Sequence, residues 1–152
     1  MNIYDVALRH LSSRSRTVAE TESYLLKKGF SEEETKVLIE EFKSCGYLDD
    51  SRYCREYFDY SFGKGKGKRR VLEELRRQGV DPQVIEIAFE DYEPEDSETE
   101  RARRETERVL RLAGIDGGDP VPEKVRGRVA RRLQAKGYSS DIIYSIIGEL
   151  KR

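Results

Sequence analysis

Three glycines repeat one pattern along the chain, and this repetition limits the folds that are possible. Gly29, Gly79 and Gly137 each follow a leucine by four residues. After each glycine come an apolar or aromatic residue, a residue suited to capping a helix, and apolar residues at helical spacing. Agreement at so many positions is improbable by chance, so the chain is predicted to repeat a helix, glycine turn, helix unit three times. The leucines expected to pack inside the three repeats are Leu25, Leu75 and Leu133.

A lead helix is predicted before each of these units. Thr17 to Glu20 and Ser97 to Glu100 have the spacing of capping boxes, which mark helix starts, and Gly114 is a predicted stop. No segment alternates as a strand does. We therefore predict an all-α fold of about nine helices in three tandem three-helix repeats, 1–49, 50–96 and 97–152.

Charge is abundant and segregated. Charged residues make up 39% of the chain, against roughly 25% in typical globular proteins, yet the net charge is only -1. Residues 61–80 hold seven basic residues and two acidic ones, whereas residues 81–100 hold nine acidic residues and no Lys or Arg. Residues 101–132 turn basic again, with ten cations and five acids. Blocks of one sign suggest a partner whose charge is also patterned, although helical charges are more often simply solvated surface.

The helix, turn, helix units resemble DNA-binding helix-turn-helix motifs, but their charges argue against that use. The helix after each turn would be the recognition helix, and two of these helices begin with acids or lack cations, as at Glu32–Glu34 and 81–92. The cations lie on the preceding helices. A repeated basic face beside a repeated acidic face is the pattern that results.

The stretch from Gly63 to Arg70 is rich in glycine and lysine. It matches neither nucleotide-binding glycine motif, and no strand precedes it, so a nucleotide site is not predicted. Two interpretations stay open: a mobile cationic loop that reaches phosphates or carboxylates, and a solvated linker.

Little in the sequence supports catalysis, a metal or a cofactor. The single histidine, His10, has no nucleophile placed by spacing, and the two cysteines, Cys45 and Cys54, are interpreted as reduced, small core residues. No window approaches the ~20 apolar residues of a membrane span, and no secretory segment begins the chain. We expect a cytoplasmic protein with no cofactor, no metal and no membrane contact.

Two segments carry a likeness to a known family. Gly46 to Tyr53, with the letters GYLDDSRY, and Gly67 to Val80, with GKRRVLEELRRQGV, together resemble signatures of the bacterial regulatory protein family RecX. The likeness covers essentially the whole chain. Departures fall in the Gly/Pro-rich joint at 113–122 and in the polar segment Thr21 to Tyr24.

The resemblance implies an elongated, curved array of repeats, monomeric and without enzymatic activity, that binds the RecA recombinase filament on single-stranded DNA. Members of the family are thought to damp the filament's growth, ATP hydrolysis, strand exchange and co-protease action. Rival hypotheses are a plain nucleic-acid-binding helical module that acts on naked DNA, and a helical scaffold for an unrelated protein.

If the chain binds the RecA filament, as the resemblance implies, its basic faces would contact the filament or its nucleic acid. The main contact would be made by Lys64, Lys66, Lys68, Arg69, Arg70, Arg76 and Arg77, a second by Arg126, Arg128, Arg131 and Arg132, and a third by Arg14, Arg16, Lys27 and Lys28. Three further residues, Tyr47, Leu48 and Tyr53, are assigned to packing between the first two repeats.

Overall fold

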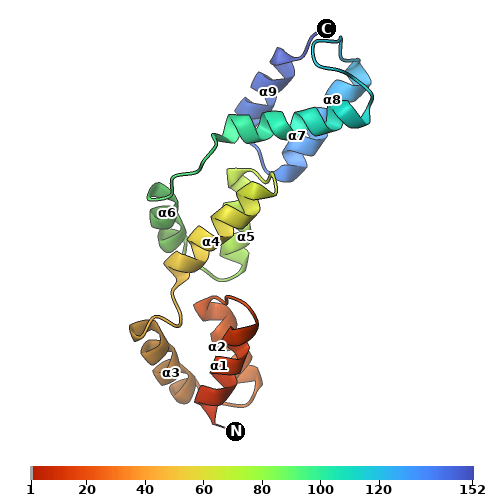
Figure 1. Ribbon diagram of the computed structural model, residues 1–152. Helices are drawn as coiled ribbons and strands as arrows, with labels where there is room; N and C mark the ends of the chain where they lie inside the picture. Colours follow the sequence, from red (N-terminus) through yellow and green to blue (C-terminus); the bar gives the residue numbers. More distant parts are fainter. Residues whose placement is uncertain (1) are drawn as a thin grey trace. The chain divides into compact units, whose positions relative to one another are not determined.

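The computed structural model describes residues 2–152, and in this part of the chain every regular element is an α-helix (Figure 1). The all-α fold class predicted from the sequence is therefore confirmed. Within residues 2–152 the nine helices are α1 (Ile3–Ser13), α2 (Val18–Lys27), α3 (Glu32–Ser44), α4 (Asp50–Gly63), α5 (Lys68–Arg77), α6 (Pro82–Glu90), α7 (Glu98–Leu112), α8 (Glu123–Lys136) and α9 (Ser140–Glu149).

The helices begin where short polar side chains can cap them. Thr17, Ser31 and Ser97 each accept a hydrogen bond from the main-chain N–H three residues on, which satisfies a donor that the first helical turn leaves unpaired. The predicted starts of α2 and α7 are thus confirmed. In the first of them the carboxylate of Glu20 pairs with the guanidinium of Arg14.

The predicted glycine stops are also confirmed. Gly29, Gly79 and Gly137 have φ of 98°, 91° and 95°, in the left-handed region that a side chain makes costly. The residue after each glycine, such as Phe30 or Val80, donates its main-chain N–H to the carbonyl of the leucine five residues before it. This bond closes the turn before the next helix.

Residue contacts divide the chain into two compact units. Unit 1 comprises the chain up to Tyr57 together with Glu74–Tyr92, and unit 2 comprises Phe58–Glu73 and Glu93–Arg152. The division cuts through α4 and α5, so each of these helices contributes to both units. The three repeats 1–49, 50–96 and 97–152 remain a prediction drawn from the sequence register.

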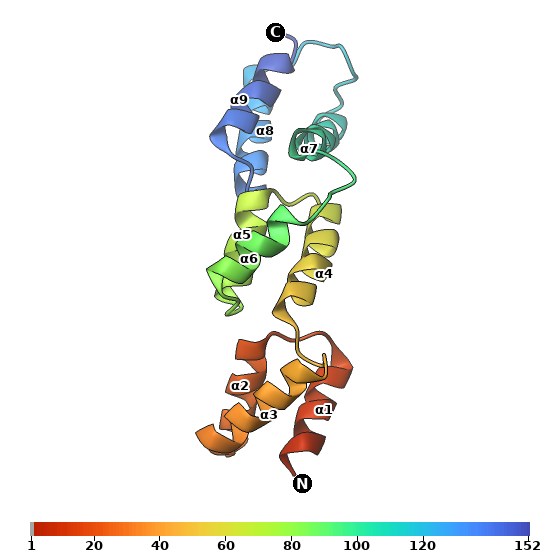
Figure 2. The same cartoon turned by 90° about the vertical axis from the view of Figure 1, so that its left-hand side faces the viewer.

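Each unit holds an apolar cluster. In unit 1 the helices α1, α2 and α3 pack together around Leu25, Leu38 and Phe42, all of which are buried. In unit 2 the helix α7 lies across α8 and α9, around the buried side chains of Val129 and Tyr138 (Figures 1 and 2). These clusters hold together the helices that bear the charged side chains.

The two cysteines differ in their surroundings. Cys54 is buried, and burial raises the pKa of its thiol to about 11, so the thiol stays protonated. Cys45 is exposed, which corrects the interpretation of both cysteines as core residues. Neither is in a disulfide.

Candidate functional site

A set of polar contacts joins the α1–α2 connection to α4 and to the α5–α6 turn in unit 1. The hydroxyl of Thr17 donates to the carbonyl of Gln78 at 3.0 Å, and the main-chain N–H of Val18 donates to the Asp50 carboxylate at 2.9 Å. A Cβ built on Gly79 would overlap the side chain of Ala19, so the turn approaches α2 more closely than any other residue would allow.

A similar set of contacts occurs in unit 2, between the α4–α5 connection and the elements of the third predicted repeat. The N–H of Gly67 donates to the carbonyl of Lys136 at 2.7 Å, and the N–H of Lys68 donates to the Glu98 carboxylate at 3.0 Å. A Cβ on Gly137 would overlap Arg70 and come within 2.7 Å of its main-chain nitrogen.

We call these contact sets the first and second junctions. The donors of the two junctions share a register, because Thr17 and Gly67, and Val18 and Lys68, are separated by one interval. The carbonyl acceptors Gln78 and Lys136 each stand directly before a turn glycine, Gly79 or Gly137. In each junction a carboxylate at the start of one lead helix, α4 or α7, caps the N-terminus of an earlier helix, α2 or α5. Asp50 therefore caps α2, and Asp49 is the residue that accepts from Arg52 N–H in α4 itself.

The second junction changes the description of the Gly/Lys stretch. It is a connection of only four residues, 64–67, and it is held in place. The hydroxyl of Tyr138 donates to the carbonyl of Gly65 at 2.7 Å, and the ammonium of Lys136 donates to the carbonyl of Lys64 at 3.2 Å. Hydrogen bonds to its main-chain carbonyls hold the backbone of this connection, and the two interpretations of its lysines, as a contact to anions or as a solvated linker, stay predictions.

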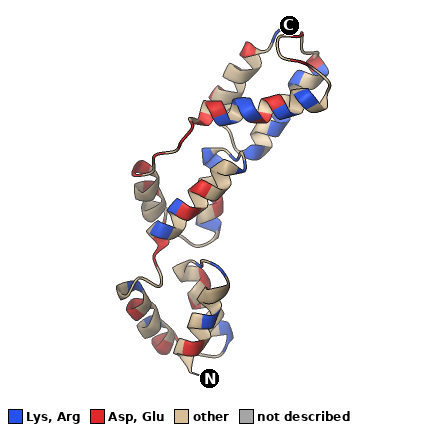
Figure 3. Ribbon diagram, viewed as in Figure 1, with Lys and Arg blue, Asp and Glu red and all other residues tan. Residues whose placement is uncertain are grey.

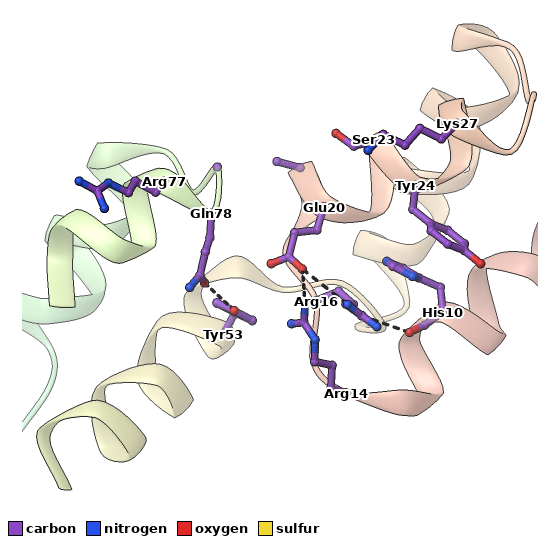
Figure 4. Close-up of a pocket in the computed structure, with 12 residues that line it drawn as sticks. His10, Arg14, Arg16, Glu20, Ser23, Tyr24, Lys27, Tyr53, Arg77 and Gln78 are labelled. Carbon is purple, nitrogen blue, oxygen red and sulfur yellow. Dashed lines mark hydrogen bonds and ion pairs between the residues drawn. The ribbon is translucent and has the colours of Figure 1, made fainter. Parts of the chain in front are cut away.

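An open groove of about 610 Å³ lies at the first junction (Figure 4). Its walls come from the end of α1, from α2, from the start of α4 and from the end of α5. Four of the cations that the sequence singled out line it: Arg14, Arg16, Lys27 and Arg77. Arg14 and Arg77 belong to two different predicted contact sets and are more than sixty residues apart in the sequence. The fold places both on the same groove.

One carboxylate organises the floor of the groove. Glu20 pairs with Arg14 at 3.0 Å and lies 3.9 Å from Arg16, whose Nε also donates to the carbonyl of His10 at 3.3 Å. These contacts hold both guanidinium groups on the groove wall (Figure 4). Four cations line the groove and Glu20 is the one carboxylate among its lining residues, so the groove is suited to an anionic partner.

Aromatic rings close one end of the same groove. His10 and Tyr24 are stacked, with ring centroids 4.0 Å apart and planes 12° from parallel, and the Lys28 ammonium lies 5.4 Å from the Tyr24 ring centroid. Burial, followed by the nearby Arg16, lowers the pKa of His10, so the ring is neutral at pH 7. A neutral imidazole packed on a ring supports the wall and adds no charge to it.

The remaining predicted cations lie at the end of α2 (Lys28), in the α4–α5 connection (Lys64, Lys66), on α5 (Lys68, Arg69, Arg70, Arg76) and on α8. Figure 3 shows Lys and Arg in blue along the ribbon. Arg128, Arg131 and Arg132 are exposed on α8. Arg126 is different, because it is 7% exposed and donates to the carbonyls of Ile147 and Leu150 at the end of α9. This geometry makes Arg126 a structural residue, and we remove it from the contact set.

Two buried charges in α7 were missed from the sequence. Arg101 is 5% exposed, its guanidinium lies 4.2 Å from the Phe62 ring centroid, and it donates to the carbonyl of Asp96. Glu105 is 2% exposed and lies 3.4 Å from both Arg108 and Arg132. Both had been counted only as parts of a charged run. The available signal was the spacing of Glu105, which follows Ala102 by three residues on the buried stripe of α7.

The residues assigned to packing have varied surroundings. Leu25, Leu75 and Leu133 are fully buried, and Leu48 is 2% exposed in the unit 1 cluster. Tyr53 lies at the first junction, where its hydroxyl donates to the Gln78 side chain at 2.6 Å. Tyr47 is 55% exposed and packs edge-to-face on Phe42 of the first predicted repeat, and its packing between repeats stays a prediction.

Two searches over the described residues were negative. Among residues 2–152 no group of three or more His, Cys, Asp or Glu side chains is placed to hold a metal ion. Over the same residues, none of the helices combines the length and the apolar character needed to cross a bilayer.

Comparisons with known proteins identify the architecture. The models of the first and second three-helix domains of RecX match residues 4–42 and 49–88. The regulatory protein RecX of Trichlorobacter lovleyi is 37% identical over 92% of this chain and 90% of its own length. The RecX protein of Mycolicibacterium smegmatis is 32% identical over 94% and 76% of the two chains. A crystal structure of RecX from Lactobacillus salivarius superimposes with a TM-score of 0.81, at 25% identity, over 97% of this chain and 94% of that one.

The fold and these matches define a regulatory protein assembled from three-helix domains. The chain belongs to the RecX family.

Proposed function

We propose that this protein binds the RecA filament on single-stranded DNA in the cytoplasm and inhibits its recombinase, ATPase and co-protease activities. It acts as a monomer and without chemistry of its own. The family membership supports the regulatory role, and the RecA filament is the partner that the family resemblance implies.

One observation carries the proposal to the level of residues. The groove of the first junction is lined by Arg14, Arg16, Lys27 and Arg77, which come from two sequence-distant segments, and by a single carboxylate, that of Glu20. A recombinase filament on single-stranded DNA carries phosphates, which are anions that such a groove attracts. The exposed cations of α5 and α8 extend the same chemistry along the chain.

The direct test is the rate of ATP hydrolysis by RecA on single-stranded DNA with this protein added below stoichiometry. The proposal expects the rate to fall, and the protein to sediment with the assembled filament. Unchanged hydrolysis together with no binding to the filament would refute it.

A useful variant replaces the side chains of Lys64, Lys66 and Lys68 with serine. The hydrogen bonds that hold this connection use its main-chain atoms, so its docked backbone is expected to persist. Weaker inhibition by the variant would mark the connection as a contact surface. Full inhibition would mean that these lysines are only solvated.

The rival function, a nucleic-acid-binding module for naked DNA, makes a different prediction. It requires tight binding to DNA without RecA, an affinity that falls steeply with salt, and no effect on the filament beyond competition for DNA. Inhibition that persists when free DNA is added in excess would exclude it.

A further inference from the structure

The two junctions share a register, but they carry different side chains at the surface. The register places Tyr60 where the first junction has His10, Lys64 in place of Arg14, and Arg70 in place of Glu20. The carboxylate that holds the first groove together is thus replaced by a cation at the second junction. Lys136 takes the place of Gln78 and adds another.

Cations from α7 and α8 gather at the second junction as well. Arg108 and Arg132, 61% and 49% exposed, both pair with the buried Glu105, which holds their guanidinium groups against α7. Arg70 donates to the carbonyl of Ala135, directly before Lys136, at 3.0 Å. Burial is the largest cause that lowers the pKa of Lys136; Glu105 opposes it, and Arg132, Arg70 and Arg108 lower it further. Several cations are therefore held close together by contacts of the fold.

Next to them lies an exposed aromatic ring. Tyr60 is 62% exposed, and the ammonium of Lys64 lies 5.5 Å from its ring centroid. The carbonyl of the same Lys64 accepts from Lys136, so Lys64 links the ring to the cationic cluster. At the first junction the equivalent ring, His10, is buried under Tyr24, and the register replaces Tyr24 by Glu74.

We propose that the second junction binds single-stranded nucleic acid, with Tyr60 stacked on an unpaired base and Lys64, Arg70, Arg108, Arg132 and Lys136 contacting phosphates. An exposed ring beside clustered cations is how sequence-tolerant proteins hold single strands, because every base has a face on which the ring can stack. The inference deepens the proposed function, on which it rests for its setting, because it assigns this surface to the strand and not to protein.

The first experiment uses the absence of tryptophan from the sequence. Tyr60→Trp places a single tryptophan at the proposed stacking position, and its fluorescence is followed while an unlabelled oligothymidylate of roughly 16 nucleotides is added without RecA. Stacking on a base is expected to quench the emission. The matched control is Tyr144→Trp, an exposed site on α9 in the same unit, where no quenching is expected.

The second experiment measures affinity by fluorescence anisotropy with a labelled strand. Tyr60→Ala is expected to weaken binding about tenfold, and Tyr60→Phe, which keeps the ring, to restore it. The double variant Lys64→Gln/Arg108→Gln is expected to lower the slope of log affinity against log salt by about 1.4, since each single-strand phosphate contact contributes roughly 0.7. Arg55→Gln/Lys124→Gln removes the same charge from exposed positions elsewhere and should leave the slope unchanged.

Melting temperatures establish that each variant folds. Equal emission changes at positions 60 and 144, or equal affinity of Tyr60→Ala and the unmodified chain, would overturn the inference. So would binding to the assembled RecA filament without any binding to the naked strand, which would assign the surface to protein. Because these assays omit RecA, their failure is separate from a failure of the filament to respond in the ATPase assay.

Discussion

Gly29, Gly79 and Gly137 share a backbone conformation but not a neighbourhood. All three have positive φ, whereas a Cβ would meet nothing within 4 Å at Gly29, would overlap Ala19 at Gly79, and would overlap Arg70 at Gly137. The first glycine is thus required by its turn alone. The other two are also required by the junctions.

Alanine substitutions should separate these two requirements. We predict that Gly29→Ala costs about 1–2 kcal/mol of unfolding free energy, the cost of a left-handed residue with a side chain. Gly137→Ala should cost about 1–3 kcal/mol more, because the added methyl group must displace backbone at the second junction. Urea denaturation of the two variants checks this, and equal losses would show that the close approach is not energetically important.

The ionisation of the Asp50 carboxyl makes the stability of the first junction depend on pH. Burial raises its pKa, and the hydrogen bond from the Val18 N–H opposes that shift. A carboxyl whose pKa is higher in the folded state stabilises the fold when protonated, and this contribution is lost as the pH rises through the raised pKa.

Asp50→Asn keeps an acceptor for Val18 without the buried charge. We predict that the stability of the unmodified chain relative to this variant falls as the pH rises from acid to neutral. Asp50→Ala, which leaves the N–H without its partner, should be less stable than both by about 1–3 kcal/mol at pH 7. Thermal unfolding across this pH range measures both effects, and a difference independent of pH would contradict the assignment.

At the scale of the helices, the end of α9 depends on a side chain of α8. Arg126 donates to two carbonyls at the end of α9, at 2.9 Å to Ile147, which also accepts from the Leu150 N–H, and at 3.2 Å to Leu150. We predict that Arg126→Ala destabilises the protein by about 3 kcal/mol, since hydrogen bonds from charged donors are lost in a buried setting. The exposed Arg128 is the matched control, and Arg128→Ala should change stability by less than about 0.5 kcal/mol. Equal effects in chemical denaturation would return Arg126 to the surface set.

The helices themselves could be predicted because their signals are local. Thr17 and Ser97 mark starts, and Gly79 marks a stop, through bonds that span at most five residues. The docking of the α4–α5 connection could not be predicted, because it depends on main-chain atoms of Lys64 and Gly65 meeting residues more than seventy positions away.

The candidate site was predicted only in part for the same reason. Composition found the cations of the groove, but it could not tell that Arg126 is buried or that Glu105 orients Arg108 and Arg132. Such roles depend on which helix faces a charged side chain. The register of the repeats gives part of this information, because it relates residues of the first junction to residues of the second.

At the scale of the whole molecule, the central claim is that repeated helical units present charged surfaces that bind the filament. The measurement that tests this most directly is the affinity for a preassembled RecA filament on single-stranded DNA. It compares Lys27→Gln/Arg77→Gln, which removes two cations of the first groove, with Lys36→Gln/Lys124→Gln, which removes two exposed cations outside it.

Both variants change the net charge equally, so non-specific attraction is matched. We predict that the groove variant binds the filament about tenfold more weakly than the unmodified chain, because two anion contacts are lost. The control variant should bind with nearly the affinity of the unmodified chain. Equal affinities of the two double variants would contradict the claim that this groove contacts the filament.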